Sequence, residues 1–420
     1  MIIKPKGTVD LIKTDAEYYK YISDIFDAYC EKYNYKFIRT PIFESSELFH
    51  RGVGDSSDIV RKETYDFKDR GNRDITLRPE GTAGVVRSFI ENKMYGTSDI
   101  TKLYYNGTMY RYERPQNGRL REFSQFGVEA FGSNDPIVDA EVISLPVNIL
   151  NALGIDNLVV KINSLGDNES REKYKKTLKD YIKPHLNELC SDCKERYEKN
   201  PLRILDCKVD KDSDILKNAP KISDYLSEKS KEHFNKVIEY LELLEINYEI
   251  DENLVRGLDY YTDTVFEIEA DIEELGASKV LGAGGRYNNL VSSLGGKETP
   301  AVGFAIGIDR LINVLKINAT NIPIKKDIDV YIMYVNETEK EKAIYLNQEL
   351  RLNGFISEIN SLNKSLKAQF KEADRYNAKY LIILNSEDFK ESMINIKDNV
   401  TKDEEKIKEL DLVEYLDTHL

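Results

Sequence analysis

The densest group of reactive side chains lies in residues 110–129, where arginines alternate with carboxylates and a glutamine. Arg111 and Glu113 precede the turn sequence PQNG, and Gln125 and Glu129 follow it. A turn between two alternating runs predicts a β-hairpin that places Arg111 and Glu113 on one face. Guanidinium groups bind phosphate and carboxylate oxygens with paired hydrogen bonds, and carboxylates bind amines. We therefore predict a cleft for a ligand that is both phosphorylated and cationic; a salt-bridged hairpin facing solvent is the alternative.

Three further segments combine glycine with arginine or tyrosine. They are LVRGLDYYTDTVFE at 254–267, GGRYNNL at 284–290 and GFAIGIDRLI at 303–312. Glycine lets a bound ligand approach the backbone closely, and the arginine of GGRYNNL suits a phosphate or an adenosine. Each segment alone could instead be a core loop or a packing strand. None is a G-x-x-x-x-G-K-[ST] or G-x-G-x-x-G loop, so a nucleotide site must use arginines of an antiparallel sheet.

Hydrophobic periodicity predicts the elements that position these segments. Helices are expected at 15–34 and 82–93, and strands at 36–41, 74–79, 102–113, 122–131, 264–270 and 279–283. Residues 165–235 are charged and helical, which indicates an insertion packed on the sheet. After a candidate linker at 316–328, strands at 328–335, 355–359 and 379–384 alternate with helices at 338–353 and 363–376.

Two domains follow from this pattern. We predict an α+β catalytic domain over 1–322, with an antiparallel sheet flanked by helices and a helical insertion at about 165–235. A small α/β domain with a mainly parallel sheet is expected over 323–420.

Composition restricts the class of protein. The 420 residues carry a net charge of −14, which argues against nonspecific binding to nucleic acid or anionic lipid. No apolar run approaches the roughly 18 residues of a membrane span, and the N-terminal sequence does not resemble a signal peptide. Four cysteines are too few for a disulfide scaffold. We therefore expect a cytoplasmic protein without a membrane partner.

Together these segments resemble the histidyl-tRNA synthetase family over essentially the whole chain. The helix and strand ending at Pro41, residues 110–129 and residues 303–312 resemble the three motifs of class II synthetases. The segments at 254–267 and 284–290 resemble the histidine-specific signatures, and RPEGT at 78–82 stands in order with them. The resemblance implies a ligase that forms histidyl-adenylate and pyrophosphate from histidine and ATP, then transfers histidine to the 3′-terminal adenosine of tRNA(His).

The resemblance also implies a role for each site residue. Arg111 would hold the α-phosphate and the histidine carboxylate, and Arg256 would neutralise the developing charge from the other side. Arg310 would hold the γ-phosphate and the adenine end, and Glu113 would also contact ATP. Magnesium is expected to bridge the phosphates.

The histidine pocket implied by the resemblance has two parts. Glu80, Thr82 and Gln125 would hold the ammonium group, with Gly81 beside them. Glu129 and Tyr261 would bind the two imidazole nitrogens, and Tyr260 and Tyr287 would complete the pocket. A site that hydrogen-bonds both nitrogens discriminates against amino acids with apolar side chains by a factor of about 10⁴–10⁵, without a separate editing site.

The C-terminal residues 323–420 resemble the anticodon-binding domain of class II synthetases, and the first motif implies a homodimer. Acidic residues outnumber basic ones after residue 320, so contact with RNA must be local. Lys364, Lys367 and Lys371 recur at helical spacing and could meet phosphate; a solvated lysine face is equally compatible.

Three cysteines have metal-ligand spacing within the predicted insertion. Cys190 and Cys193 form a C-x-x-C pair, and Cys207 follows. A structural zinc site needs four ligands, and His185 is the only evident fourth. We therefore favour reduced thiols over zinc.

Two alternative functions remain to be compared. A non-catalytic, synthetase-like regulatory subunit of ATP phosphoribosyltransferase shares the catalytic core, but it typically lacks the C-terminal domain and the intact RGLDYY sequence. A class II synthetase for another amino acid would keep the arginines without the 254–267 and 284–290 signatures. The chain carries all of these features.

Overall fold

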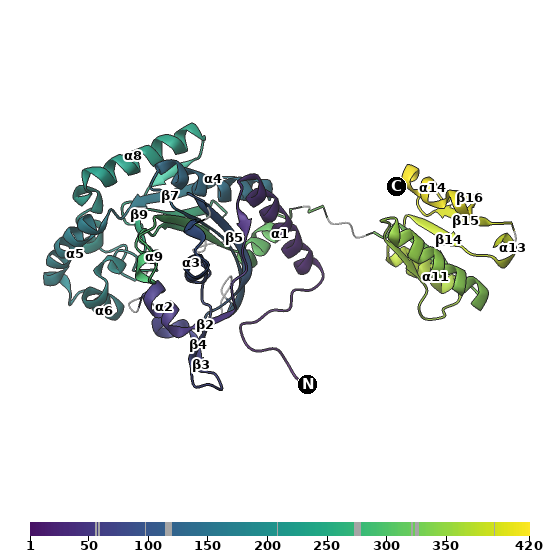
Figure 1. Ribbon diagram of the computed structural model, residues 1–420, viewed down its shortest axis with the longest axis horizontal. Helices are drawn as coiled ribbons and strands as arrows, with labels where there is room; N and C mark the ends of the chain where they lie inside the picture. Colours follow the sequence, from purple (N-terminus) through teal and green to yellow (C-terminus); the bar gives the residue numbers. More distant parts are fainter. Residues whose placement is uncertain are drawn as a thin grey trace. The chain divides into compact units, whose positions relative to one another are not determined.

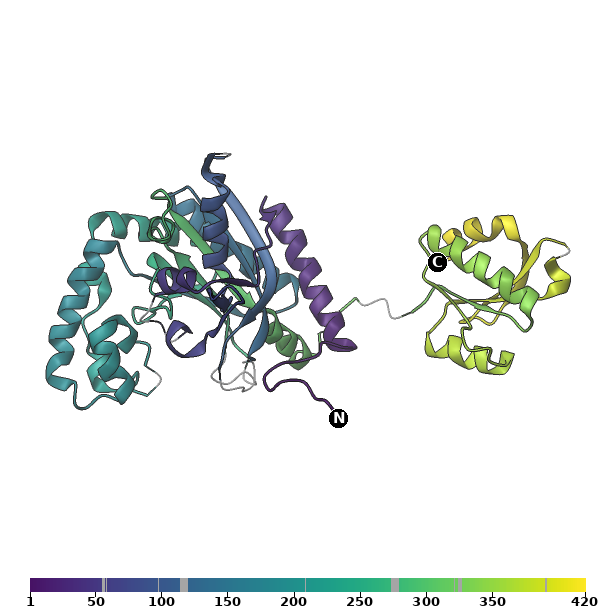
Figure 2. The same ribbon diagram turned by 60° about the horizontal axis from the view of Figure 1, so that its bottom comes forward.

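The computed structural model divides into two compact units, Met1–Ile322 and Pro323–Leu420 (Figures 1 and 2). It describes residues 1–54, 57, 59–96, 98–113, 120–207, 209–272, 279–320, 322–323, 327–389 and 391–420. The predicted PQNG turn, with Arg114 and Arg119 on either side, lies outside these residues. Among the helices of the described chain, none has the length and apolar character needed to cross a membrane.

An eight-stranded sheet with the order β1-β5-β6-β11-β10-β9-β7-β8 forms the centre of the first unit. Its strands are β1 (Lys36–Phe37), β5 (Thr101–Tyr110), β6 (Glu122–Phe131), β7 (Leu158–Ser164), β8 (Tyr248–Ile250), β9 (Thr262–Ala270), β10 (Val280–Arg286) and β11 (Ala301–Gly307). The inner pairings are antiparallel, whereas β1 with β5 and β7 with β8 are parallel. The predicted antiparallel sheet is therefore confirmed.

Helices pack against this sheet (Figure 2). Helix α1 (Thr14–Lys32) contacts α4 (Pro136–Ala152) and α10 (Ile308–Ile317), and the ring of its Phe26 stacks on Phe126 of β6. Helix α3 (Thr82–Glu91) begins where the RPEGT segment ends, and the ring of Phe89 stacks on that of Phe131, with 4.4 Å between centroids. The helix spacing seen in the sequence thus corresponds to packing on the sheet.

A small sheet precedes α3, with the order β2 (Phe43–Ser45), β4 (Asp74–Leu77), β3 (Tyr65–Lys68). Helix α2 (Ser46–Val53) follows β2 and contacts α3. β4 leads directly into the RPEGT segment and α3, so the small sheet fixes the start of that segment.

Helices fill the chain between β7 and β8, as Figure 1 shows. The longest are α5 (Asn168–Ile182), α6 (Ser191–Lys199) and α8 (Glu228–Leu243), with the short α7 (Asp214–Lys217) between them. Buried side chains of this region, including Tyr174, Leu178 and Cys193, belong to the same apolar cluster as Tyr260 and Tyr287. The helical segment and the sheet therefore share one core.

The second unit has a five-stranded sheet with the order β13-β12-β14-β15-β16. Its elements are β12 (Val330–Met333), α11 (Glu337–Leu352), β13 (Ser357–Ile359), α12 (Leu366–Arg375), β14 (Tyr380–Ile383), α13 (Ser386–Phe389), β15 (Met393–Asp398), β16 (Glu404–Lys408) and α14 (Leu412–His419). The predicted strands pair in parallel, and the hairpin β15–β16, which the sequence analysis missed, adds two antiparallel pairings. Lys364 was expected on one helix face with Lys367 and Lys371, but it precedes α12 and its Nζ lies 2.6 Å from Glu372.

A buried ion pair joins the end of β10 to α4. Arg286 is fully buried, and its Nε lies 2.9 Å from Oδ1 of Asp139, which is also fully buried. The Nη1 of Arg286 donates to the Ser133 carbonyl at 2.8 Å. Burial alone would raise the pKa of Asp139, but Arg286 and His233 bring it below its usual value. The suggestion that the GGRYNNL arginine meets phosphate is therefore wrong, because this arginine holds the fold together.

Removal of the carboxylate from this pair should destabilise the first unit strongly. Asp139→Ala leaves the Arg286 guanidinium buried without its counter-charge, which costs about 3–5 kcal/mol. Urea unfolding measures the loss. The control is Glu169→Ala, which breaks the exposed pair with Lys173 and should change stability by less than about 0.5 kcal/mol. Similar, small changes in both variants would contradict the structural role.

Candidate active site

One cavity of about 360 Å³ gathers the predicted site residues of the first unit. Its lining includes Glu80, Thr82, Arg111, Glu113, Gln125, Glu129, Arg256, Tyr260, Tyr261, Tyr287 and Arg310. These side chains come from the RPEGT segment, from β6 and the end of β5, and from the chain around β9, β10 and α10. Gly81 is the one predicted residue outside this lining, and it stands between Glu80 and Thr82. Segments that are far apart in the sequence therefore converge on one site.

Glu129 is a buried carboxyl group in the cavity wall. It is 1 % exposed, accepts a hydrogen bond from Thr82 Oγ1 at 2.7 Å, and accepts another from the Tyr287 hydroxyl. Burial raises the pKa of Glu129 to about 8, and the negative charge of the nearby Glu80 also raises it. The hydrogen bonds from Thr82 and Tyr287 lower the pKa but do not cancel this rise. A Cβ at Gly303 on the neighbouring strand would lie 2.0 Å from Glu129 Oε2. Only glycine at position 303 leaves room for this carboxyl group.

Glu80 holds the start of α3. Its two carboxylate oxygens accept hydrogen bonds at 2.8 Å from the backbone N–H groups of Thr82 and Ala83. Burial raises the pKa of Glu80, although these N–H groups oppose the shift. Next to it, a Cβ at Gly81 would lie 2.3 Å from the Tyr105 ring, so glycine is required for this packing. Each oxygen of Glu80 keeps a second lone pair that a cationic group could use.

Gln125 and three tyrosines complete this end of the cavity. Gln125 Oε1 is buried and has no hydrogen-bond partner among the described residues. Tyr260 packs against Tyr261 and Tyr287, with ring centroids 4.7 and 5.6 Å apart. A buried amide oxygen without a donor is costly unless a ligand supplies one. This end of the cavity therefore suits a small, partly aromatic ligand with a hydrogen-bond donor.

Arg256 is half-buried beside the tyrosines and forms an ion pair with Glu267 of β9. Burial would lower the pKa of Arg256, but the Glu267 carboxylate raises it, so the guanidinium stays charged. Its Nε has no hydrogen-bond partner in the described part of the chain, and its guanidinium lies 5.9 Å from the centre of the Tyr261 ring. An unpaired N–H group remains for an anionic ligand.

Two more arginines face the other part of the cavity. The Nε of Arg111 donates to the Pro79 carbonyl at 2.9 Å, and its guanidinium lies 5.3 Å from the centre of the Phe123 ring. Arg310 donates to the Val280 carbonyl. The carboxyl group of Asp309 accepts a hydrogen bond from the Ser124 backbone at 2.7 Å. Backbone contacts thus hold both arginines at the cavity.

Sequence reasoning missed several residues that shape this site: Tyr105, Gly303, Glu267 and Asp309. The last three lie inside the segments 254–267 and 303–312, whose arginines and tyrosines were predicted as site residues. Tyr105 lies in the strand that precedes Arg111, where alternation alone does not distinguish a site residue from a core residue.

The arrangement suits chemistry between two anions. Three arginines around one cavity can neutralise a phosphate and a carboxylate. Arg111 follows β5, Arg256 lies in the loop before β9, and Arg310 lies in α10. The sequence analysis predicted a cleft for a ligand that is both phosphorylated and cationic, and the residues on which that prediction rests line this cavity.

Comparison with known proteins identifies the family. A family model described as histidyl-tRNA synthetase matches residues 7–311, and one described as anticodon binding domain matches residues 329–419. The chain is 51 % identical to a histidine–tRNA ligase of Bacillus cytotoxicus over 404 residues, which is 96 % of each chain. It is 49 % identical to that of a Geobacillus species over 417 residues, or 99 % of each.

Solved structures agree with these relatives. The apo histidyl-tRNA synthetase of S. aureus has a TM-score of 0.85 at 40 % identity, covering 99 % of this chain and all of that one. A structure from Bacillus halodurans, titled as an ATP phosphoribosyltransferase regulatory subunit/histidyl-tRNA synthetase, has a TM-score of 0.66 at 23 % identity. It covers 91 % of this chain and 98 % of its own, and shares the fold alone.

The chain belongs to the histidyl-tRNA synthetase family. This confirms the resemblance found in the sequence, the fold class, and the prediction of a ligase rather than a regulatory subunit.

The raised pKa of Glu129 makes stability depend on pH. Below about pH 4.5 the carboxyl group is protonated in both the folded and unfolded states. Between pH 4.5 and about 8 the unfolded state ionises first, so the folded state loses stability as the pH rises. Glu129→Gln removes this loss, and its stability relative to the wild type should rise by a few kcal/mol across that window and then level off.

Urea unfolding at a series of pH values measures this difference. The control is Glu198→Gln, because the Glu198 side chain is 74 % exposed. Its free energy of unfolding should change with pH in parallel with that of the wild type. A Glu129→Gln curve that also runs parallel to the wild type would contradict the raised pKa.

Proposed function

We propose that this protein joins histidine to tRNA(His) in two steps at the cavity of the first unit. Histidine and ATP first give histidyl-adenylate and pyrophosphate, and the histidyl group then passes to the 3′-terminal adenosine of the tRNA. One observation carries the proposal: a buried carboxyl group ringed by tyrosines shares a cavity of about 360 Å³ with three arginines.

The first step brings two anions together. A carboxylate oxygen of histidine attacks the α-phosphorus of ATP, a new C–O–P linkage forms, and the bond to pyrophosphate breaks. No proton has to be moved, so catalysis rests on positioning and on neutralising charge. Arg111 holds the α-phosphate and the histidine carboxylate, and Arg256 neutralises the charge that develops on the other side.

Arg256 is prepared for this role by Glu267. The ion pair keeps the guanidinium charged and oriented inside the protein, while the unpaired Nε is left for the phosphate. Arg310 holds the γ-phosphate and the adenine end, and Glu113 also contacts ATP.

Histidine occupies the part of the cavity lined by tyrosines. Its ammonium group lies beside Glu80, Thr82 and Gln125, where the unpaired Gln125 Oε1 offers an acceptor. Glu129 and Tyr261 bind the two imidazole nitrogens. A ligand without these nitrogens leaves buried polar groups unpaired, which is the physical basis of selectivity.

We expect ATP to bring Mg²⁺ with it. Glu113 and Asp309, whose carboxyl groups line the cavity, would hold this hard cation. When bound, the ion neutralises charge on the phosphate oxygens.

The second unit supplies contact with the tRNA. Its match to an anticodon binding domain supports this role, and the excess of acidic residues restricts the contact to local basic groups. A homodimer and a cytoplasmic location are parts of the same proposal.

Amino-acid-dependent exchange between ATP and pyrophosphate tests the function. The assay is run on the pure protein with each of the twenty amino acids singly, after circular dichroism has verified folding. Exchange with histidine alone is the expected result. Exchange with another amino acid would overturn the pocket assignment, and no exchange by the folded protein would overturn the proposed enzyme.

Loss of the Arg256 guanidinium should slow chemistry more than binding. In Arg256→Ala, single-turnover formation of the adenylate should fall by about 10²–10³-fold, the cost of removing one preorganised charge-stabilising group. Histidine affinity, measured by calorimetry, should change little.

The control for this variant is Arg73→Ala, because the Arg73 side chain is 78 % exposed and pairs with Asp69 near the β3–β4 hairpin. It should form adenylate at the wild-type rate. Wild-type kinetics in Arg256→Ala would remove Arg256 from the proposed mechanism.

A further inference from the structure

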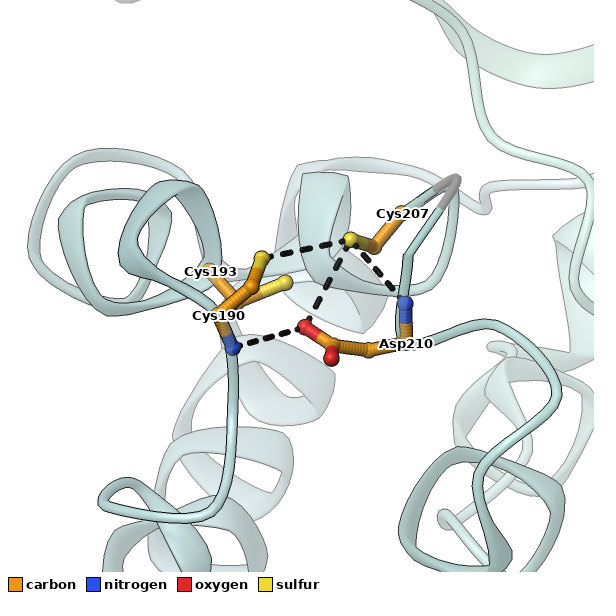
Figure 3. Close-up of side chains that lie close together, drawn as sticks. All are labelled: Cys190, Cys193, Cys207 and Asp210. Atoms are coloured by element: carbon orange, nitrogen blue, oxygen red, sulfur yellow. Dashed lines mark hydrogen bonds between the residues drawn. The ribbon is translucent and has the colours of Figure 1, made fainter.

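Three cysteines and one aspartate converge in the helical segment between β7 and β8 (Figure 3). Cys190 and Cys193 stand at the start of α6, and Cys207 and Asp210 follow the short helix η4 (Pro201–Ile204). The four candidate ligand atoms all lie within 4.8 Å of one another. Cys207 Sγ lies 3.6 Å from Cys190 Sγ and 3.5 Å from Asp210 Oδ2.

The separations of 3.6 and 3.5 Å are close to two edges of a zinc tetrahedron. With Zn–S bonds of about 2.3 Å and a Zn–O bond of about 2.0 Å, tetrahedral angles give about 3.8 Å between sulfurs and about 3.5 Å between sulfur and oxygen. A disulfide would need its sulfurs at about 2.05 Å, and it would leave one thiol and the carboxylate unused. With all four ligand atoms within 4.8 Å of one another, the cluster can surround one ion after a small contraction.

Burial and hydrogen bonds also suit a cation here. Cys193 and Cys207 are buried, with 0 % and 2 % of their surface exposed. Asp210 Oδ2 accepts the Cys190 backbone N–H at 3.0 Å, and the Asp210 backbone N–H donates to Cys207 Sγ at 3.4 Å. Backbone N–H groups directed at thiolate and carboxylate ligands orient them and spread their charge.

The fourth ligand differs from the one considered in the sequence. His185 Nδ1 lies 3.0 Å from Glu188 Oε1, so that imidazole already has a carboxylate partner, while Asp210 faces the three thiols. We propose that Cys190, Cys193, Cys207 and Asp210 bind one Zn²⁺ ion as a closed structural site. Soft thiolates in a tetrahedral set select zinc over the hard cations that accompany ATP.

The proposed site closes a loop that supports the active site. Between the two ligand pairs, Asn200 Nδ2 donates to Asp259 Oδ1 at 2.6 Å, and Arg203 Nη1 donates to the Gly257 carbonyl at 3.0 Å. Gly257 directly follows Arg256 in the chain, and Asp259 lies two residues further on. The zinc ion thus fixes the segment that holds the Arg256 loop, a consequence that rests on the proposed function.

Metal analysis of the full chain tests the site without any assay of activity. The protein is purified under reducing conditions without chelator, supplied with Zn²⁺ and desalted, and its zinc is measured by mass spectrometry. We expect about one ion per chain in the wild type and in the control Cys30→Ser, whose cysteine is buried in α1 away from the cluster. Cys193→Ser should lose most of the zinc, and Asp210→Asn should lose it faster to a chelator.

Cobalt substitution of the wild-type protein keeps the test independent of how the variants fold. Tetrahedral thiolate ligation predicts strong d–d absorption together with a sulfur-to-cobalt charge-transfer band. Three results would each overturn the site. The first is wild-type protein that carries no zinc and has titratable thiols. The others are an equal zinc content in Cys193→Ser and wild type, and a Cys190–Cys207 disulfide in the reduced preparation. These results do not depend on the exchange assay, so the zinc site and the proposed function can fail separately.

Discussion

The burial of a carboxyl group in the wall of the cavity constrains much of the surrounding structure. Glu129 stands on β6 between two neighbouring strands, where its pKa rises to about 8 because water is excluded. Thr82 and Tyr287 donate hydrogen bonds to this carboxyl group. Gly303 leaves room for it, because a Cβ at position 303 would overlap Glu129 Oε2. Each of these residues comes from a different segment, so the carboxyl group can be buried here only when those segments pack together.

The ion pairs of Arg256 and Arg286 explain why the segments 254–267 and 284–290 have different roles. Arg286 is fully buried and pairs with Asp139 of α4, whereas the half-buried Arg256 pairs with Glu267 at the cavity. The first pair has its hydrogen bonds completed by protein groups. In the second, the Nε–H group of Arg256 has no partner among the described residues, and Arg256 lines the cavity. A completed pair stabilises the fold, and an incomplete pair can bind a ligand.

Much of this arrangement could be predicted from the sequence because it is local. Alternation gave the β5–β6 strands, helical spacing gave α1 and α3, and the arginine-rich stretches indicated phosphate. The role of Arg286 could not be predicted, because its partner Asp139 lies on a helix 147 positions away in the chain. The cluster of three cysteines and one aspartate illustrates the same limit, since Asp210 contacts Cys190 from 20 positions further along the chain. Hairpin β15–β16 was missed because its charged, weakly alternating sequence resembles a loop.

A crystal structure with bound histidine tests the central claim most directly. We expect the imidazole ring to lie between the Glu129 carboxyl group and the Tyr261 hydroxyl, with the ammonium group within hydrogen-bond distance of Gln125 Oε1. Histidine bound with its ring away from Glu129, or with its ammonium group in place of the ring, would contradict the view that the buried carboxyl group selects the substrate.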